Sequence, residues 1–104
     1  MDIDTLRREV RPPLEAAFGS RLRGIVLFGS RARGDASADS DIDLLVLLDD
    51  PLSVGRDIDT IVEALYPLQL EIDAAIHALP ARAETYERGT FALYRNAQAE
   101  GIRL

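Results

Sequence analysis

The sequence predicts a domain of the α/β (α+β) class, because short apolar runs typical of strands alternate along the chain with apolar stripes typical of helices. Residues 24–28 form one such run, and residues 44–48 consist only of leucine and valine. Between residues 54 and 65 the apolar side chains instead recur every three or four positions, which is the period of a helix that packs on one side. At 104 residues the chain has the size of a compact domain, so we expect a single domain over residues 1–104.

The first part of the chain predicts a helix followed by a buried strand. Four apolar residues at every fourth position define the helix face: Leu6, Val10, Leu14 and Phe18. Pro12 and Pro13 lie within this pattern, so we expect the helix in one or two pieces, kinked or interrupted at the prolines. The strand at residues 24–28 leads into Gly29 and Ser30, and the polar segment 31–40 predicts a short helical turn and a loop.

The rest of the chain predicts two longer strands and further helices. The second strand runs from about residue 41 to residue 48, and the helix after it begins at a Ser53 cap and ends near Pro67. From residue 70 to residue 76 apolar residues alternate with others, which is the period of a strand with two different faces and predicts the third strand. The tail predicts more helix, with Thr90 as a cap, and a short closing strand at residues 102–104.

Composition narrows the classes of function. The net charge of -6 argues against broad binding of long RNA or DNA, which normally requires a basic surface. The absence of cysteine excludes disulfides, a thiolate metal site and a cysteine nucleophile, and the absence of lysine excludes a lysine-based phosphate site. The apolar runs are too short for a membrane helix and the acidic start does not resemble a signal peptide, so we expect a cytoplasmic protein.

Three aspartates predict a metal site. Asp41 and Asp43 are two residues apart in a predicted strand, so their carboxylates project from the same face and offer the hard oxygen ligands that Mg²⁺ favours. Asp73, on the predicted third strand, would add a third carboxylate, and three acids can hold two metal ions about 4 Å apart for an in-line phosphoryl displacement. Asp73 could also accept the proton of the attacking hydroxyl. Without cations, such a cluster of like charges would destabilise the fold.

The turn at Gly29 and Ser30 predicts a phosphate-binding site. It joins a strand to a short helix, where free backbone N–H groups favour an anion. Gly29 removes the side chain that would block close approach, and Ser30 adds a hydroxyl donor. Arg31 and Arg33 follow in the same turn, and their guanidinium groups could neutralise a triphosphate or the leaving pyrophosphate.

The sequence leaves the roles of several other polar residues near these positions open. Glu71 shares the predicted strand face of Asp73 and could replace it as the third acid, although we prefer Asp73 because it lies deeper in the strand. His77 is interpreted as an ordinary strand-end histidine, with a ligand role as the alternative. Asp35 and Asp39 are interpreted as loop residues, with outer-sphere help to the metal as the alternative.

The two motifs together resemble the signature of a known family. The run from Gly29 to Asp35, followed by Asp41-Ile42-Asp43-Leu44, is similar to the motif of the minimal nucleotidyltransferase (MNT) family within the polymerase-beta-like nucleotidyltransferase superfamily. The spacing matches without insertion, and the resemblance covers essentially the whole chain. It implies the minimal nucleotidyltransferase fold, a small mixed β-sheet flanked by helices. It also implies ATP as cosubstrate and Mg²⁺, with Asp41 and Asp43 as metal ligands and Asp73 as the third acid.

The resemblance further implies a partner. Many MNT proteins similar to this sequence are the antitoxin half of HEPN/MNT toxin-antitoxin pairs, in which the MNT protein transfers AMP from ATP to a tyrosine of its HEPN ribonuclease toxin. The short tail after Asp73 leads us to expect that another chain brings the acceptor. Two other functions stay open: a stoichiometric antitoxin that masks the toxin by contact and has a vestigial site, and transfer to a small molecule such as an aminoglycoside, for which a homo-oligomer would supply a second wall.

Overall fold

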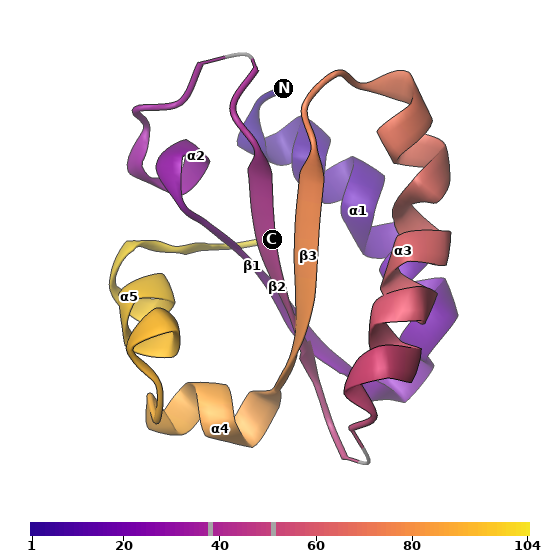
Figure 1. Ribbon diagram of the computed structural model, residues 1–104, viewed down its shortest axis with the longest axis vertical. Coiled ribbons are helices and arrows are strands. Elements are labelled where there is room, and N and C mark those ends of the chain that lie inside the picture. The colour runs from indigo at the N-terminus through magenta and orange to yellow at the C-terminus, as the bar shows by residue number, and fades with distance from the viewer. Residues whose placement is uncertain (38, 51) are drawn as a thin grey trace.

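Four strands form one mixed sheet in this computed structural model, which describes residues 1–37, 39–50 and 52–104. The strands are β1 (Leu22–Phe28), β2 (Ile42–Leu48), β3 (Ile76–Arg82) and β4 (Ile102–Arg103). They are ordered β3-β2-β1-β4, with β1 antiparallel to both β2 and β4 and with β2 parallel to β3. The predicted mixed sheet flanked by helices is therefore confirmed (Figure 1).

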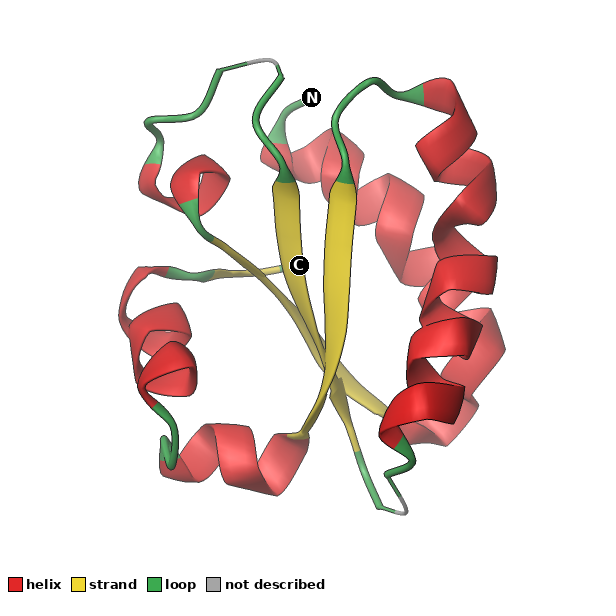
Figure 2. Ribbon diagram, viewed as in Figure 1, coloured by secondary structure: helices red, strands yellow, loops and turns green. Residues whose placement is uncertain are grey.

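Helices lie on both sides of this sheet, as Figure 2 shows. They are α1 (Ile3–Phe18), α2 (Ser30–Arg33), α3 (Val54–Glu71), α4 (Ala83–Arg88) and α5 (Ala92–Glu100), with a 3-10 turn, η1 (Gly19–Arg21), before β1. The helices α1 and α3 pack on one face, whereas α4 and α5 pack on part of the other face. Within the described ranges, no helix is both long enough and apolar enough to cross a membrane.

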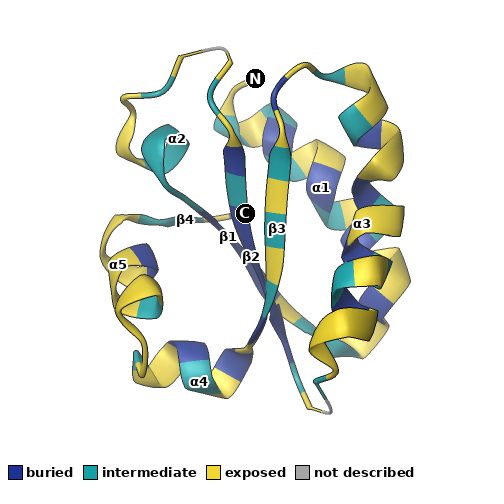
Figure 3. Cartoon of the chain, viewed as in Figure 1, coloured by how far each residue is buried: buried dark blue, intermediate teal, exposed yellow. Residues whose placement is uncertain are grey.

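The alternation of side chains along β2 builds two separate apolar clusters. Leu44 and Val46 point to the face of α1 and α3 and are 0% exposed. Leu45 and Leu47 point the other way and pack with residues of α4 and α5. A strand buried on both faces reads as a continuous apolar run, which explains why residues 44–48 carry no polar side chain. Figure 3 shows this strand in the colour of buried residues over most of its length.

The first helix is one continuous element. Pro12 and Pro13 lie inside α1 without dividing it, which settles the choice between one piece and two. The helix begins after Asp2, whose carboxylate accepts a hydrogen bond from the backbone N–H of Thr5 at 2.7 Å. The four residues of its predicted apolar stripe are all buried, and packing along the whole stripe holds the helix together across the prolines.

A buried acid holds the start of α3. Ser53 is the cap residue as predicted, but its side chain makes no capping hydrogen bond. Instead, the carboxylate of Asp57, 3% exposed, accepts a hydrogen bond from the backbone N–H of Ser53 at 3.1 Å. It also accepts two hydrogen bonds from the Arg21 guanidinium, both at 3.1 Å, and these bonds lower the pKa of Asp57.

Two predictions about the middle of the chain are wrong. The helix α3 does not end near Pro67 but continues to Glu71, and the third strand begins at Ile76 rather than at residue 70. The buried Leu68 extends the packed face of α3 by another turn, which outweighs the one hydrogen bond that Pro67 cannot make. Leu70 is 70% exposed, so the alternation that predicted a strand there does not reflect two packed faces.

The tail follows its prediction more closely. Helices α4 and α5 precede the short strand β4, as expected from the sequence. The residue before α5 is Phe91 rather than Thr90, so the predicted cap is displaced by one position.

Candidate active site

The end of β1 places a glycine beside a carboxylate of β2. Phe28 is paired with Asp43 across the two strands, and Gly29 follows with a φ of 75°. A Cβ atom on Gly29 would lie 2.5 Å from Oδ2 of Asp43, closer than real side chains approach. Glycine is therefore required here both for the left-handed backbone and for the space beside the carboxylate. Ser30 then begins α2, so the predicted phosphate turn lies directly next to Asp43.

Asp41 and Asp43 lie at the beginning of β2. Asp43 is inside the strand and Asp41 immediately precedes it, so strand alternation directs both away from the face on which Ile42 is buried. The side chain of Asp41 is 56% exposed, and Asp43 is half-buried. Both carboxylates are thus accessible at the end of the sheet face that α4 and α5 cover only in part.

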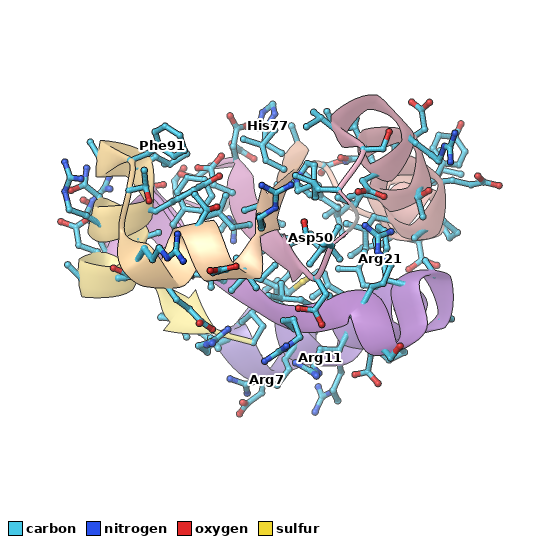
Figure 4. All side chains as sticks on the ribbon, turned by 90° about the horizontal axis from the view of Figure 1, so that it is seen from below. Arg7, Arg11, Arg21, Asp50, His77 and Phe91 are labelled. Atoms are coloured by element: carbon cyan, nitrogen blue, oxygen red, sulfur yellow. The ribbon has the colours of Figure 1, made fainter. Side chains whose placement is uncertain are left out.

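The strand β3 adds a histidine to these two acids. In the parallel register His77 is paired with Asp43, and Nε2 of His77 lies 3.2 Å from Oδ2 of Asp41. His77 projects on the side of the molecule opposite to Arg7 and Arg11 of α1, as Figure 4 shows. From the sequence, His77 is interpreted as an ordinary histidine at the end of a strand. In the structure it is the second residue of β3, and knowing where β3 starts would have placed it beside Asp43.

Asp73 and Glu71 lie elsewhere than predicted. Glu71 is the last residue of α3 and Asp73 belongs to the loop before β3, so neither is on a strand. Both line a pocket with Ile42, whose side chain points to the opposite face of β2 from Asp43. Across residues 1–37, 39–50 and 52–104, no three or more His, Asp or Glu side chains gather closely enough to hold one metal ion. The role of Asp73 as the third acid therefore stays a prediction.

The two arginines of the turn contact protein groups in this structure. Nε and Nη2 of Arg31 donate to the carbonyl oxygen of Ser40 at 3.0 and 2.8 Å, which ties α2 to the residue before Asp41. Arg33 is exposed and pairs with Asp35 at 3.4 Å and with Glu100 at 3.7 Å. Contact of either guanidinium with phosphate stays a prediction, and Arg31 already helps to position Asp41.

The donor set fits a divalent metal ion and a phosphate chain. Two carboxylates on one side supply oxygen ligands, and Mg²⁺ is commonly bound by one or two carboxylates together with substrate phosphates. Gly29 leaves the space beside Asp43 free of side-chain atoms. A strand-turn-helix that presents Gly-Ser next to Asp-x-Asp is an arrangement suited to moving a phosphate-linked group.

The fold and this site define a class of enzyme, and comparison with known families agrees. Residues 3–98 match the family described as nucleotidyltransferase domain. The match covers most of the chain, so the protein belongs to this family and is a nucleotidyltransferase.

Individual relatives refine this assignment. The chain is 32% identical over 89 residues to the Methanocaldococcus jannaschii protein named "Putative protein adenylyltransferase MJ0604", covering 85% of this chain and 83% of the relative. It is 25% identical to a chain in the crystal structure of a mutant of the toxin-antitoxin complex MntA-HpeT, with a TM-score of 0.55 over 98% of this chain and 68% of that one. A toxin-antitoxin structure with AMP-PNP gives a TM-score of 0.57 at 23% identity over 97% of this chain and 68% of that one, which is a likeness of fold.

Proposed function

We propose that this protein is the antitoxin of a HEPN/MNT pair and transfers AMP from ATP to a tyrosine hydroxyl of a HEPN ribonuclease toxin. The observation that carries the proposal is the position of Asp41 and Asp43 at the start of β2, with the carboxylate of Asp43 directly against Gly29. The relative named as a protein adenylyltransferase supports AMP as the transferred group and protein as the acceptor. The neighbouring toxin-antitoxin structures support the partner class.

The residues of the site have separable tasks in this reaction. Asp41 and Asp43 would hold Mg²⁺, which when bound neutralises the phosphate oxygens and the leaving pyrophosphate. Gly29 leaves room for the Asp43 carboxylate beside the turn, and Ser30 would offer its hydroxyl and backbone N–H as donors to the triphosphate. Arg31 keeps the backbone before Asp41 in place through Ser40. The tyrosine oxygen then bonds to the α-phosphorus, pyrophosphate leaves with the electrons of the broken P–O bond, and the phenol proton passes to water.

An apolar groove beside the site supports a protein acceptor. A pocket of about 240 Å³ lies between α3 and β3 and is lined mainly by apolar residues, together with Gln69 and His77. Because His77 contacts Asp41, the pocket borders the site. Val62 and Tyr66 of this groove are each 57% exposed, and Leu79 is 45% exposed. Apolar side chains that remain exposed together commonly mark a surface that binds another protein. We therefore assign this groove to the toxin, with the acceptor tyrosine reaching the site from that side.

A titration distinguishes an enzyme that modifies the toxin from an antitoxin that only binds it in a fixed ratio. The protein is mixed at increasing ratios with a fixed amount of a candidate HEPN ribonuclease toxin, with and without ATP and Mg²⁺. We expect full neutralisation of the ribonuclease at ratios far below one to one, because each enzyme molecule can turn over. Intact mass spectrometry of the toxin should show added AMP, and peptide mapping should locate it on tyrosine.

The matched variants are the double change Asp41→Asn with Asp43→Asn and, as a control, Asp59→Asn on the exposed side of α3. The double variant should lose transfer and the control should keep it. Neutralisation by the double variant at the ratio of the unaltered protein, with no mass change in either, would instead establish the stoichiometric mask.

A further inference from the structure

The chain's one histidine lies against a proposed metal ligand. His77 and Asp41 approach to 3.2 Å, and their side chains are 59% and 56% exposed. An ion pair this exposed adds little to folding stability, because water screens it and two side chains must be ordered to form it. Stability therefore does not explain why the two groups face each other.

The backbone around His77 is fixed independently of this contact. Nε2 of Gln69 donates to the carbonyl of Ala74 at 2.9 Å, and Oε1 of Gln69 accepts from the N–H of Ile76 at 2.8 Å. The carbonyl of Ala75 accepts from the N–H of Ile42 at 2.8 Å, which joins the starts of the two strands. These bonds hold the segment directly before His77, so its side chain reaches Asp41 from a defined position.

The separation of the two groups is that of two ligands on one ion. Ligands about 2.1 Å from a metal and at right angles to each other lie about 3 Å apart. Imidazole nitrogen and carboxylate oxygen are both common metal donors. The face of β2 that carries Asp41 also carries Asp43, whose carboxylate points toward Gly29 and the phosphate turn. His77 and Asp41 are thus already at ligand spacing, whereas the carboxylate of Asp43 on the same face lies against Gly29.

We propose that Nε2 of His77 binds the same divalent ion as Asp41, and that this nitrogen makes the site prefer a transition metal ion such as Mn²⁺, Co²⁺ or Zn²⁺ over Mg²⁺. The inference rests on the metal-binding site of the proposed function and assigns a ligand role to His77 where the sequence had suggested Asp73. The chemical reason is that Mg²⁺ favours oxygen donors, whereas imidazole raises the affinity of a site for transition ions.

Pulsed electron paramagnetic resonance of bound Mn²⁺ tests this ligand directly. Tag-free protein labelled with ¹⁵N-histidine is loaded with Mn²⁺ alone, and the ¹⁵N coupling is recorded. Because the sequence holds one histidine, any such coupling identifies His77. We expect the coupling in the unaltered protein, its loss in His77→Asp with Mn²⁺ still bound, and weaker Mn²⁺ binding in Asp41→Asn. Competition with Mg²⁺ should show the Mn²⁺ preference falling by about tenfold or more in His77→Asp.

The other results have defined meanings. Asp41-dependent binding of Mn²⁺ without ¹⁵N coupling would overturn the role of His77. Loss of binding in Asp73→Asn but not in His77→Ala would overturn it too and return the ligand role to Asp73. Transfer of AMP to the toxin is measured in parallel with each ion: ¹⁵N coupling without any transfer would end the proposed function while leaving the metal site in place. No specific Mn²⁺ binding by the unaltered protein would overturn the inference, and transfer with Mg²⁺ would then decide the proposed function separately.

Discussion

The two faces of β2 differ in what covers them. On one face, Ile42, Leu44 and Val46 pack against α1 and α3 and are at most 1% exposed. On the other face, α4 and α5 cover Leu45 and Leu47, while Asp43 stays half-buried at the uncovered end. One face of the strand is therefore apolar and covered throughout, whereas the other is covered at Leu45 and Leu47 and carries Asp43 at its uncovered end. Substitutions on the two faces should change different measurements.

The largest effect is expected from a leucine on the covered face. Leu44 is 0% exposed, so Leu44→Ala should lower the free energy of unfolding by about 2–5 kcal/mol through lost burial and the cavity left behind. The matched change Leu79→Ala removes a side chain that is 45% exposed on the partly covered side, and should cost about 1 kcal/mol or less. Urea unfolding measures both, and equal losses would contradict the difference in burial between these two side chains.

The ion pair that holds α3 on the covered face should make stability depend on pH. The pKa of Asp57 is lowered by the Arg21 guanidinium, so its contribution is present above the ordinary pKa of the carboxyl group and is lost as the pH falls through the lowered pKa. At pH 7, Asp57→Asn should lower the free energy of unfolding by about 2 kcal/mol, because hydrogen bonds to a charged group are lost. Below about pH 4, the ordinary pKa of aspartic acid, the gap between the two proteins should narrow. A gap that stays constant from pH 7 to pH 3 would count against this role.

A moderate change in stability, together with a specific loss of binding, is expected at the site. Gly29 and Gly34 both have a positive φ, of 75° and 80°. Alanine at Gly34, in the left-handed helical region, should cost about 1–2 kcal/mol of unfolding free energy, and alanine at Gly29, whose ψ of -158° is nearly restricted to glycine, about 1–3 kcal/mol. A Cβ atom at Gly29 meets Asp43, whereas at Gly34 nothing lies within 4 Å. Gly29→Ala should therefore weaken binding of ATP with Mg²⁺, and Gly34→Ala should not. Calorimetric titration of both variants checks this, and equal affinities would show that the turn is only structural.

The half of the site that is local in sequence could be predicted. Gly29 directly follows β1 and Asp43 lies in β2, and a short helix and a loop join the two strands. Their neighbourhood therefore follows from the order of elements and the antiparallel pairing of Phe28 with Asp43. When a motif of fixed spacing lies within one such unit, the relative positions of its residues can be predicted from the sequence. The same locality allowed the buried run of β2 to be recognised.

The positions of His77 and Asp73 could not be predicted, because they depend on where α3 ends and β3 begins. Apolar alternation from residue 70 indicated a strand, but Leu70 is exposed and α3 continues to Glu71. The later start of β3 removes Asp73 from the sheet and brings His77 beside Asp43. The hydrogen bonds of Gln69 that fix this turn join a side chain to two backbone groups several residues away, and no periodic pattern reveals such bonds.

Because hydrogen bonds fix α3 at both ends, the number of residues between them determines whether both sets of bonds can form. Asp57 attaches the first turn to Arg21 and Ser53, and Gln69 attaches the last turn to the segment before His77. A helix advances about 1.5 Å and turns about 100° with each residue. One residue added or removed between these anchors would rotate Gln69 away from its partners even if every apolar position were repacked. The length of the helix thus sets the position of the segment before His77 relative to Arg21 and Ser53.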